Sequence, residues 1–404
     1  MIHRRAHRAG LTRCHTGRPD LVDSGRGLSG CSTSVAEVSI TWDHALAWRM
    51  RRQLLEPVGA VSVADVVRKL GAVLAMDEGA AELAVGIRRT GSHSGELGRA
   101  LEDGQVIKSF AFRGAVHYLS PEDAGAYLAL RASGRQWELP SWQEFYELKP
   151  GDWPAFRATV RQALEEGPLT MNELGATVTR KAAYRHLRPV FDDGAGTLIK
   201  PLTWQGDVCL GPRRDGQQTF QRLDDNPRWR GVWDLDEAGP HAIAAYFRAY
   251  GPATHDHIHY WLGNGLSAGR KCLQLWLTRM SDRLVEVDVA GESAFVLGED
   301  VDELMAARPT SAVRLLPGHD QWVIGPGTKD AHVVPPTRRT PVTRKANLVV
   351  AGGVVRGTWL AKAGDVEVTW FGENGKPPLN DVAEEVGRLS AFLDRPLKMT
   401  VKIG

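Results

Sequence analysis

The chain has 404 residues and a mass of 44.3 kDa, enough for about two to four compact units. Apolar residues make up 43% and charged residues 24%, which excludes wholesale disorder, and no run of about 18 apolar residues is present to span a membrane. The formal net charge of +2 excludes a uniformly basic nucleic-acid binder, so DNA binding would need a local cluster of cations. Four cysteines without a CxxC pair exclude a disulfide framework and a cysteine-based zinc site.

Residues 1–37 show neither a helical nor a strand period and carry six arginines against three acidic residues. The basic start is not followed by the apolar stretch of a secretion signal. We therefore expect a disordered basic leader or an upstream, mis-assigned start codon. A basic arm that binds DNA is the alternative.

Three helices and a hairpin are predicted next. The first helix begins after Thr41, and the second is capped by Ser62 and closed by Gly71. Residues 82–90 suggest a third helix or a short buried segment, and residues 105–119 have the β-branched and aromatic content of two short strands. This order of elements is typical of a winged helix.

A repeated signature follows. GPLTMNEL at residues 167–174 recurs 84 residues later as GPATHDHI at residues 251–258, each time after an amphipathic helix and with threonine in the capping position. Both units end in a β-prone run, at 198–212 and 284–297. The pattern predicts tandem winged helices, because such units pass from their first helix through a short strand into a helix-turn-helix.

From about residue 312 the chain consists of short strands with glycine turns, one helix and a last strand. This predicts an α+β protein that ends in a small β-barrel-like or sheet-plus-helix unit. Residues 326–362 carry seven basic residues against one acid, and three prolines favour an extended loop suited to phosphates. The predicted boundaries are a leader at 1–37, winged helices at 38–135, 136–225 and 226–310, and the β-rich unit at 311–404.

Six stretches of the chain resemble the AlkZ-like tandem winged-helix proteins of bacteria. They are TWDHALAWRMRRQLLEP, LGAVLAMDEGAAELAVGIRR, IKSFAFRGAVHYLSPED, LIKPLTWQGDVCLGP, AYGPATHDHIHYWLG and VRLLPGHDQWVIG. Characterised members of that family are DNA glycosylases that remove bulky or crosslinking alkylated bases. The resemblance implies three winged helices and a C-terminal β-unit, arranged as a curved clamp around duplex DNA.

The resemblance also locates a catalytic motif of two glutamines separated by one small residue. Here those positions are Leu74 and Met76, with Ala75 between them, and we predict that they are non-functional. Aliphatic and thioether side chains cannot position or activate water, whereas amides and carboxylates can. Asp77 is a possible substitute, although alternation along an extended loop predicts that its side chain faces away from that of Met76.

Candidate DNA contacts come from two regions. Arg113 and His117 match the family's Arg-Gly-x-x-His stretch, which suggests a phosphate contact and a place near the lesion pocket, or simply the closing of a hairpin. The others come from the basic C-terminal segment and are Arg338, Arg339, Arg344 and Lys345.

Three functions remain open at this stage. The chain is a duplex-DNA-binding protein of glycosylase descent with weak or lost excision, an active glycosylase with a rearranged carboxylate, or a non-enzymatic transcriptional regulator. The sequence predicts no cofactor and no metal, because the three histidines of residues 255–259 share no single helix face and no nucleotide-binding loop is present. We expect a cytoplasmic, nucleoid-associated monomer that binds double-stranded DNA and no membrane.

Overall fold

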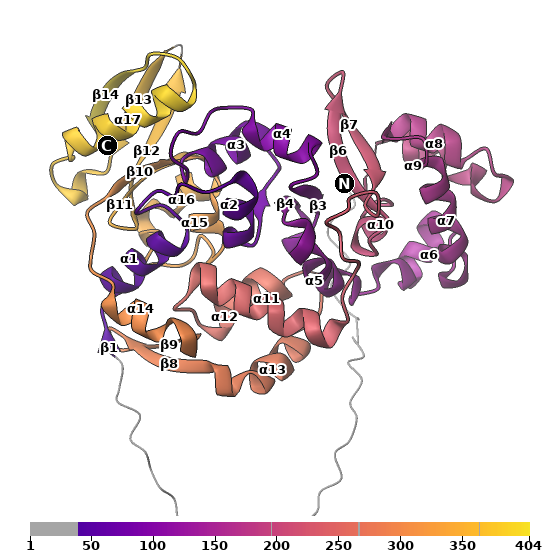
Figure 1. The fold of residues 1–404 in the computed structure, drawn as a ribbon, viewed down its shortest axis with the longest axis horizontal. Coiled ribbons are helices and arrows are strands. Elements are labelled where there is room, and N and C mark those ends of the chain that lie inside the picture. The colour runs from indigo at the N-terminus through magenta and orange to yellow at the C-terminus, as the bar shows by residue number, and fades with distance from the viewer. Residues whose placement is uncertain (1–38, 195, 266, 363) are drawn as a thin grey trace, which may run out of the picture.

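The structure is a computed structural model that describes residues 39–194, 196–265, 267–362 and 364–404 (Figure 1). The predicted leader at 1–37 lies outside the described residues. Helices and strands are mixed throughout this part of the chain, and its strands form three sheets. Among the described residues, no helix is long and apolar enough to cross a membrane.

The predicted helix starts are confirmed at four positions. In each, a serine or threonine hydroxyl accepts a hydrogen bond from the backbone N–H three residues later, which satisfies one of the free donors of the first helical turn. The caps are Thr41, Ser62, Thr170 and Thr254. The helices that they begin are α1 (Trp42–Arg52), α2 (Val63–Leu70), α8 (Met171–Val178) and α12 (His255–Ile258).

One six-stranded sheet runs through the first two predicted units, in the order β2-β4-β3-β6-β7-β5. Its strands are β2 (Val73–Leu74), β3 (Ile107–Phe110), β4 (Val116–Leu119), β5 (Leu169–Thr170), β6 (Val208–Arg214) and β7 (Gln217–Arg222). The two halves meet where Lys108 of β3 pairs with Leu210 of β6. Each half has a hairpin and one short strand, as a winged helix does.

Helices flank this sheet. Those of the first half are α2, α3 (Glu78–Gly86), α4 (Glu96–Glu102) and α5 (Pro121–Ala132). Those of the second half are α6 (Pro140–Tyr146), α7 (Trp153–Ala163), α8, α9 (Arg188–Asp192) and α10 (Lys200–Trp204). α5 also contacts α10 of the second half, so it links the two halves of the sheet. It contacts α11 (Leu235–Tyr250) as well, which belongs to a third group of helices.

The third group mixes segments from distant parts of the chain. It contains α11 (Leu235–Tyr250), α13 (Gly269–Arg279), α14 (Val301–Ala306) and the hairpin of β8 (Leu284–Val289) and β9 (Glu292–Leu297). β1 (Ser39–Ile40) pairs with β8 in parallel, and α1 packs on α11 and α14. β1 and α1 therefore pack with this group, although the predicted boundaries placed them in the first winged helix. The count of three winged helices stays a prediction.

The C-terminal sheet is open, so the barrel-like form that we predicted is wrong, and the unit takes the alternative form, a sheet with a helix. Its order is β10-β11-β12-β13-β14, and its edge strands β10 and β14 do not pair. The strands are β10 (Val313–Leu316), β11 (Asn347–Ala351), β12 (Val354–Lys362), β13 (Asp365–Trp370) and β14 (Lys398–Ile403). β14 joins β13 in parallel through α17 (Leu379–Phe392), which packs on β10. A helix therefore covers the apolar face that barrel closure would have buried.

The proline-rich segment is also not the extended loop that the sequence predicted. It forms a short 3₁₀-helix at Pro336–Arg338 followed by α16 (Arg339–Thr343). Proline is tolerated there because the first turn of a helix needs no donor from its N–H groups. In Figure 1, the C-terminal sheet and the helices α6–α9 lie at opposite ends of the longest axis.

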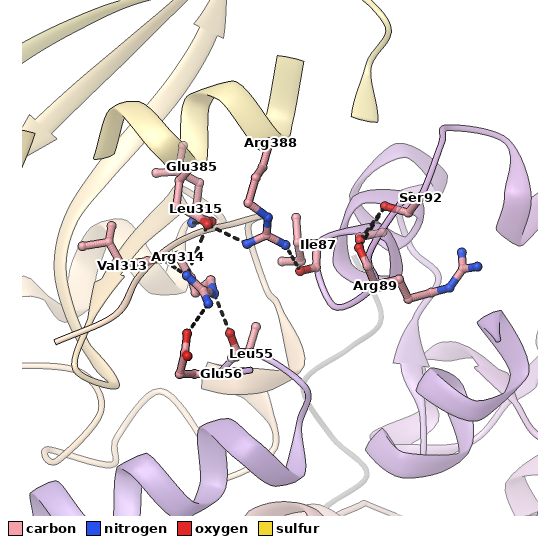
Figure 2. A network of polar contacts seen from close by, with 11 residues as sticks. Leu55, Glu56, Ile87, Arg89, Ser92, Val313, Arg314, Leu315, Glu385 and Arg388 are labelled. Atoms are coloured by element: carbon pink, nitrogen blue, oxygen red, sulfur yellow. Dashed lines mark hydrogen bonds and ion pairs between the residues drawn. The ribbon is translucent and has the colours of Figure 1, made fainter. Parts of the chain in front are cut away.

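A polar network joins the C-terminal sheet to the first unit (Figure 2). The carboxylate of Glu385 on α17 is only 4% exposed and accepts hydrogen bonds from Arg314, Arg388 and the backbone N–H of Leu315. Arg314 also reaches Glu56, and Arg388 donates to the carbonyl of Ile87. These contacts connect β10 and α17 of the C-terminal unit to residues 56 and 87 of the first unit.

We predict that Glu385→Ala lowers the free energy of unfolding by about 3 kcal/mol, because it leaves two arginines near the interface without their shared buried carboxylate. Urea unfolding measures the change. The matched control is Glu367→Ala on the same sheet, whose pair with Lys402 is about half exposed and is worth less than about 1 kcal/mol. Equal losses from the two variants would contradict the prediction.

Candidate functional site

A cavity of about 670 Å³ lies where the first unit, the third group and the C-terminal unit meet. Apolar and aromatic side chains form much of its wall, and a few polar groups converge on it. The lining residues are Val73, Leu74, Met76, Asp77, Ala80, Ala84, Phe112, Arg113, Ala115, His117, Tyr260, Trp261, Pro317, Gly318, His319, Asp320, Gln321, Ile324, Thr328, Thr343 and Lys345.

Both predicted motif positions line this cavity. Leu74 ends β2, is partly buried and lies opposite His117 of β4 in the strand ladder. Met76 lies in the loop between β2 and α3, and 67% of its surface is exposed. At these positions the cavity wall therefore presents the aliphatic side chain of Leu74 and the thioether of Met76. Neither side chain ionises or donates a hydrogen bond.

Asp77 lines the same cavity as Met76. Strand alternation stops before Asp77, because this residue is already the N-cap of α3 and accepts a hydrogen bond from the N–H of Ala80 at 3.0 Å. Its other oxygen lies 2.7 Å from Nζ of Lys345. The hydrogen bond from Lys345 and the one from the backbone hold the pKa of Asp77 below its ordinary value. Asp77 is thus ionised and already engaged through both oxygens.

Arg113 and His117 are brought together at the cavity in different states. Arg113 is exposed, donates from Nη1 to the hydroxyl of Tyr260 at 2.5 Å and lies over that ring. His117 is 1% exposed, and its Nδ1 lies 3.1 Å from the carbonyl of Ala115. Burial lowers the pKa of His117 to about 4, so the ring is neutral near pH 7 and its Nε2 is an acceptor. His117 therefore cannot hold a phosphate as a cation.

The four predicted cations of the C-terminal segment are not equivalent. Arg338 makes a two-pronged ion pair with Glu373, at 2.7 and 2.6 Å. Arg339 is partly buried and Arg344 is exposed, and neither lines the cavity. Only Lys345 of this group reaches the cavity, where it bridges to Asp77.

Sequence reasoning missed a polar pair on the cavity floor. Gln321 begins α15 (Gln321–Ile324), is 1% exposed and donates from Nε2 to the carbonyl of Ala72, next to β2. Its Oε1 is buried and has no partner among the described residues. Asp320 beside it forms an ion pair with Arg88, and both side chains are fully buried. The signal was the His-Asp-Gln triplet at 319–321 between two apolar runs.

Two of the three histidines in residues 255–259, His255 and His257, serve local structure. The ring of His255 stacks on Phe295 at 4.7 Å, and His257 takes part in the capping of α12. Within the described ranges, no group of three His, Cys, Asp or Glu side chains is placed to hold a metal ion.

Comparison with known proteins gives three consistent matches. The family model "DNA glycosylase AlkZ-like" matches residues 67–392. An interstrand DNA cross-link repair glycosylase of Streptomyces sahachiroi is 36% identical over 368 residues, which cover 89% of this chain and 99% of that protein. The solved structure of the Streptomyces sahachiroi DNA glycosylase AlkZ superposes with a TM-score of 0.85 at 34% identity, covering 90% of this chain and 100% of the other.

We predict that Lys345→Met raises the pKa of Asp77 toward the ordinary aspartate value, because the largest cause of the lowering is removed. A lowered pKa stabilises the fold above about pH 4, and this contribution is lost as the pH falls through the folded-state pKa. Since both side chains are about half exposed, the variant should lose less than about 1 kcal/mol of stability at pH 7. Carboxyl ¹³C NMR titration measures the shift, and an unchanged Asp77 pKa would rule out the bridge.

Proposed function

The chain belongs to the AlkZ-like DNA glycosylase family, and from this premise we propose that it is a duplex-DNA-binding protein whose base excision is weak or absent. The fold and the matches over most of the chain support the DNA-binding part of the proposal. The relative of Streptomyces sahachiroi is a repair glycosylase for interstrand DNA cross-links, so the DNA proposed here is double-stranded and alkylated or crosslinked. We infer a monomer that encloses the duplex with tandem winged helices and the C-terminal sheet.

The observation that carries the proposal is the chemistry of the cavity wall. Hydrolysis of a glycosidic bond needs a group that orients or deprotonates water beside the sugar. Leu74 and Met76 stand where the family resemblance places two glutamines, and both face the cavity. Apolar side chains there also raise the cost of holding a water molecule.

The two carboxylates of the described cavity wall are both occupied. Asp77 caps α3 and pairs with Lys345, while Asp320 pairs with the buried Arg88. Glu78, the next acidic residue, is paired with Lys108 and does not line the cavity. A carboxylate base for water is therefore available only if one of these contacts is broken.

Cations at the cavity rim favour DNA binding. Arg113 and Lys345 are exposed, and each makes a contact that a phosphate can replace at little cost, because exposed pairs contribute only about 0–1 kcal/mol. Together they offer two positive charges at the same cavity. Such contacts fix the position of a duplex without reading its sequence.

An active glycosylase for bulky or crosslinking alkylated bases is the second candidate. It is favoured by the position of Asp77 in the same cavity as Met76, and by the unpartnered Oε1 of Gln321 on the cavity floor. In this version, DNA draws Lys345 away from Asp77, and the carboxylate that is released activates water.

We predict that the wild-type protein binds duplex DNA and excises alkylated bases feebly or not at all. The double variant Leu74→Gln, Met76→Gln should recover excision, since loss of a positioned catalytic group typically lowers a rate by ~100-fold to ~10,000-fold. Strand breaks at abasic sites in an alkylated duplex measure excision. Recovery supports the proposal, and failure of the double variant means that these two positions are not what suppresses excision.

The matched control is Met305→Gln on α14, another exposed methionine that does not line the cavity. It should leave excision at the wild-type level. Robust excision by the wild type that is abolished in Asp77→Asn would contradict the proposal and establish the second candidate.

A further inference from the structure

An exposed methionine stands at the edge of the cavity. Among the large apolar side chains that are exposed in the described ranges, Met76 alone lines this cavity, and 67% of its surface is open to solvent. It precedes Asp77, the N-cap of α3, and an apolar side chain in that position often packs back onto the first turns of the helix. Ala81, the residue it would meet there, is buried, but Met76 packs on none of the apolar clusters of the described chain. Its side chain is therefore free to contact a ligand.

Strained turns carry polar side chains at the same cavity. Nine non-glycine residues of the described ranges have a positive φ, a conformation that is costly for a residue with a side chain, and three of these residues line the cavity. They are Arg113, His319 and Lys345, with φ values of +54°, +60° and +68°. Nε2 of His319 donates to the carbonyl of Thr343 at 3.2 Å, which connects the turn at His319 to the segment that carries Lys345. Strained backbone of this kind is concentrated at ligand sites.

Two of these residues place positive charge beside the methionine. Nζ of Lys345 lies 2.7 Å from the carboxylate of Asp77, the residue that follows Met76. The guanidinium of Arg113 lies over the ring of Tyr260 at 4.4 Å. Both cations are exposed and line the same cavity as the methionine. A duplex whose phosphates contact them therefore brings its base pairs against the Met76 side chain.

The cavity behind Met76 has room for a displaced base. Its volume is about 670 Å³, and its wall includes the rings of Phe112 and Trp261, which stack on each other with centroids 4.8 Å apart. Aromatic rings offer a surface on which any base can stack, whatever its hydrogen-bonding groups.

We propose that Met76 is a wedge that enters a duplex at a weakened base step and holds the two neighbouring base pairs apart. This inference rests on the proposed duplex binding and adds to it a preference for DNA whose stacking is already disturbed. Proteins that open or kink a duplex insert apolar side chains, methionine included, between neighbouring bases. Unstacking costs least at a mismatched or damaged pair, so the wedge selects such sites without reading a sequence. A glutamine would fill this role poorly, because its amide would be buried between bases without hydrogen-bond partners.

The test compares the Kd for a matched duplex with the Kd for the same duplex carrying one central mismatch. The wild type should bind the mismatched duplex about 10-fold more tightly, since less free energy is spent on unstacking. Met76→Ala should bind both duplexes with nearly equal Kd, because the alanine methyl group is too short to enter the step. The matched control, Met305→Ala, changes an exposed methionine of α14 that does not line the cavity, and it should behave as the wild type.

Salt dependence separates the wedge from the charges around it. Met76→Ala removes no phosphate contact, so its slope of log Kd against log salt concentration should equal that of the wild type. Lys345→Met should lose about one unit of that slope and keep the preference for the mismatch. A loss of the preference in Lys345→Met alone would assign the selection to charge and overturn the wedge.

A 2-aminopurine base beside the mismatch reports unstacking directly, since its fluorescence rises when it leaves the stack. The wild type and Met305→Ala should raise this fluorescence on binding, and Met76→Ala should not. Because Met76 is exposed, Met76→Ala should keep the wild-type melting temperature, so a failure to fold would not explain the loss.

The remaining outcomes distinguish this inference from the proposed function. If Met76→Ala keeps both the mismatch preference and the rise in fluorescence, the wedge is overturned and duplex binding stands. The same follows if the wild type binds both duplexes equally and leaves the fluorescence unchanged. A wild type that binds neither duplex at about 50 mM salt, where phosphate contacts are strong, overturns the proposed function and the wedge with it.

Discussion

The fully buried ion pair between Arg88 and Asp320 holds the walls of the cavity in place. Arg88 follows α3 and donates 2.7 and 2.8 Å hydrogen bonds to the two oxygens of Asp320, whose Oδ1 also accepts from the N–H of Trp322. Arg88 further donates to the carbonyl of Gln53. Separating the pair would leave two buried charges with neither solvent nor a counter-ion, which is costly. The pair therefore fixes the two cavity walls relative to each other. Gln321 is thereby held against the strand that carries Leu74.

Within this rigid frame, the two positions that the family resemblance assigns to catalysis carry apolar side chains, Leu74 and Met76. The two carboxylates of the described cavity wall are engaged in ion pairs with Lys345 and Arg88. At the rim, Arg113 and Lys345 are exposed cations in contacts that a phosphate can replace. These features are the basis of our proposal that the protein binds DNA with weak or absent excision.

The sequence predicted those features that depend on neighbouring residues. The four helix caps could be recognised because a cap needs only a hydroxyl and the backbone three residues later. The family resemblance assigned Leu74 and Met76 to a site, and both line the same cavity as His117. The pairing of β1 with β8 joins residues about 250 positions apart, and no local pattern encodes it.

The same limit explains why two forms of the C-terminal unit stayed open and why the contacts of Asp77 could not be predicted. The strand-rich sequence after residue 312 indicates a sheet. Whether its edge strands β10 and β14 pair with each other depends on α17, which packs on one face of that sheet. The state of Asp77 depends on Lys345, which lies 268 residues away in the sequence. The polar triplet at 319–321 was visible, but its place on the cavity floor follows only from the buried pair with Arg88.

The central claim is that this protein binds an alkylated duplex without excising the base. The most direct measurement mixes excess wild-type protein with one end-labelled alkylated duplex, and reads the bound fraction by gel shift and the excised fraction by alkaline strand cleavage of the same sample. The account predicts that the duplex is bound and that its strand remains intact. Cleavage that proceeds to completion in the protein-bound fraction would contradict it.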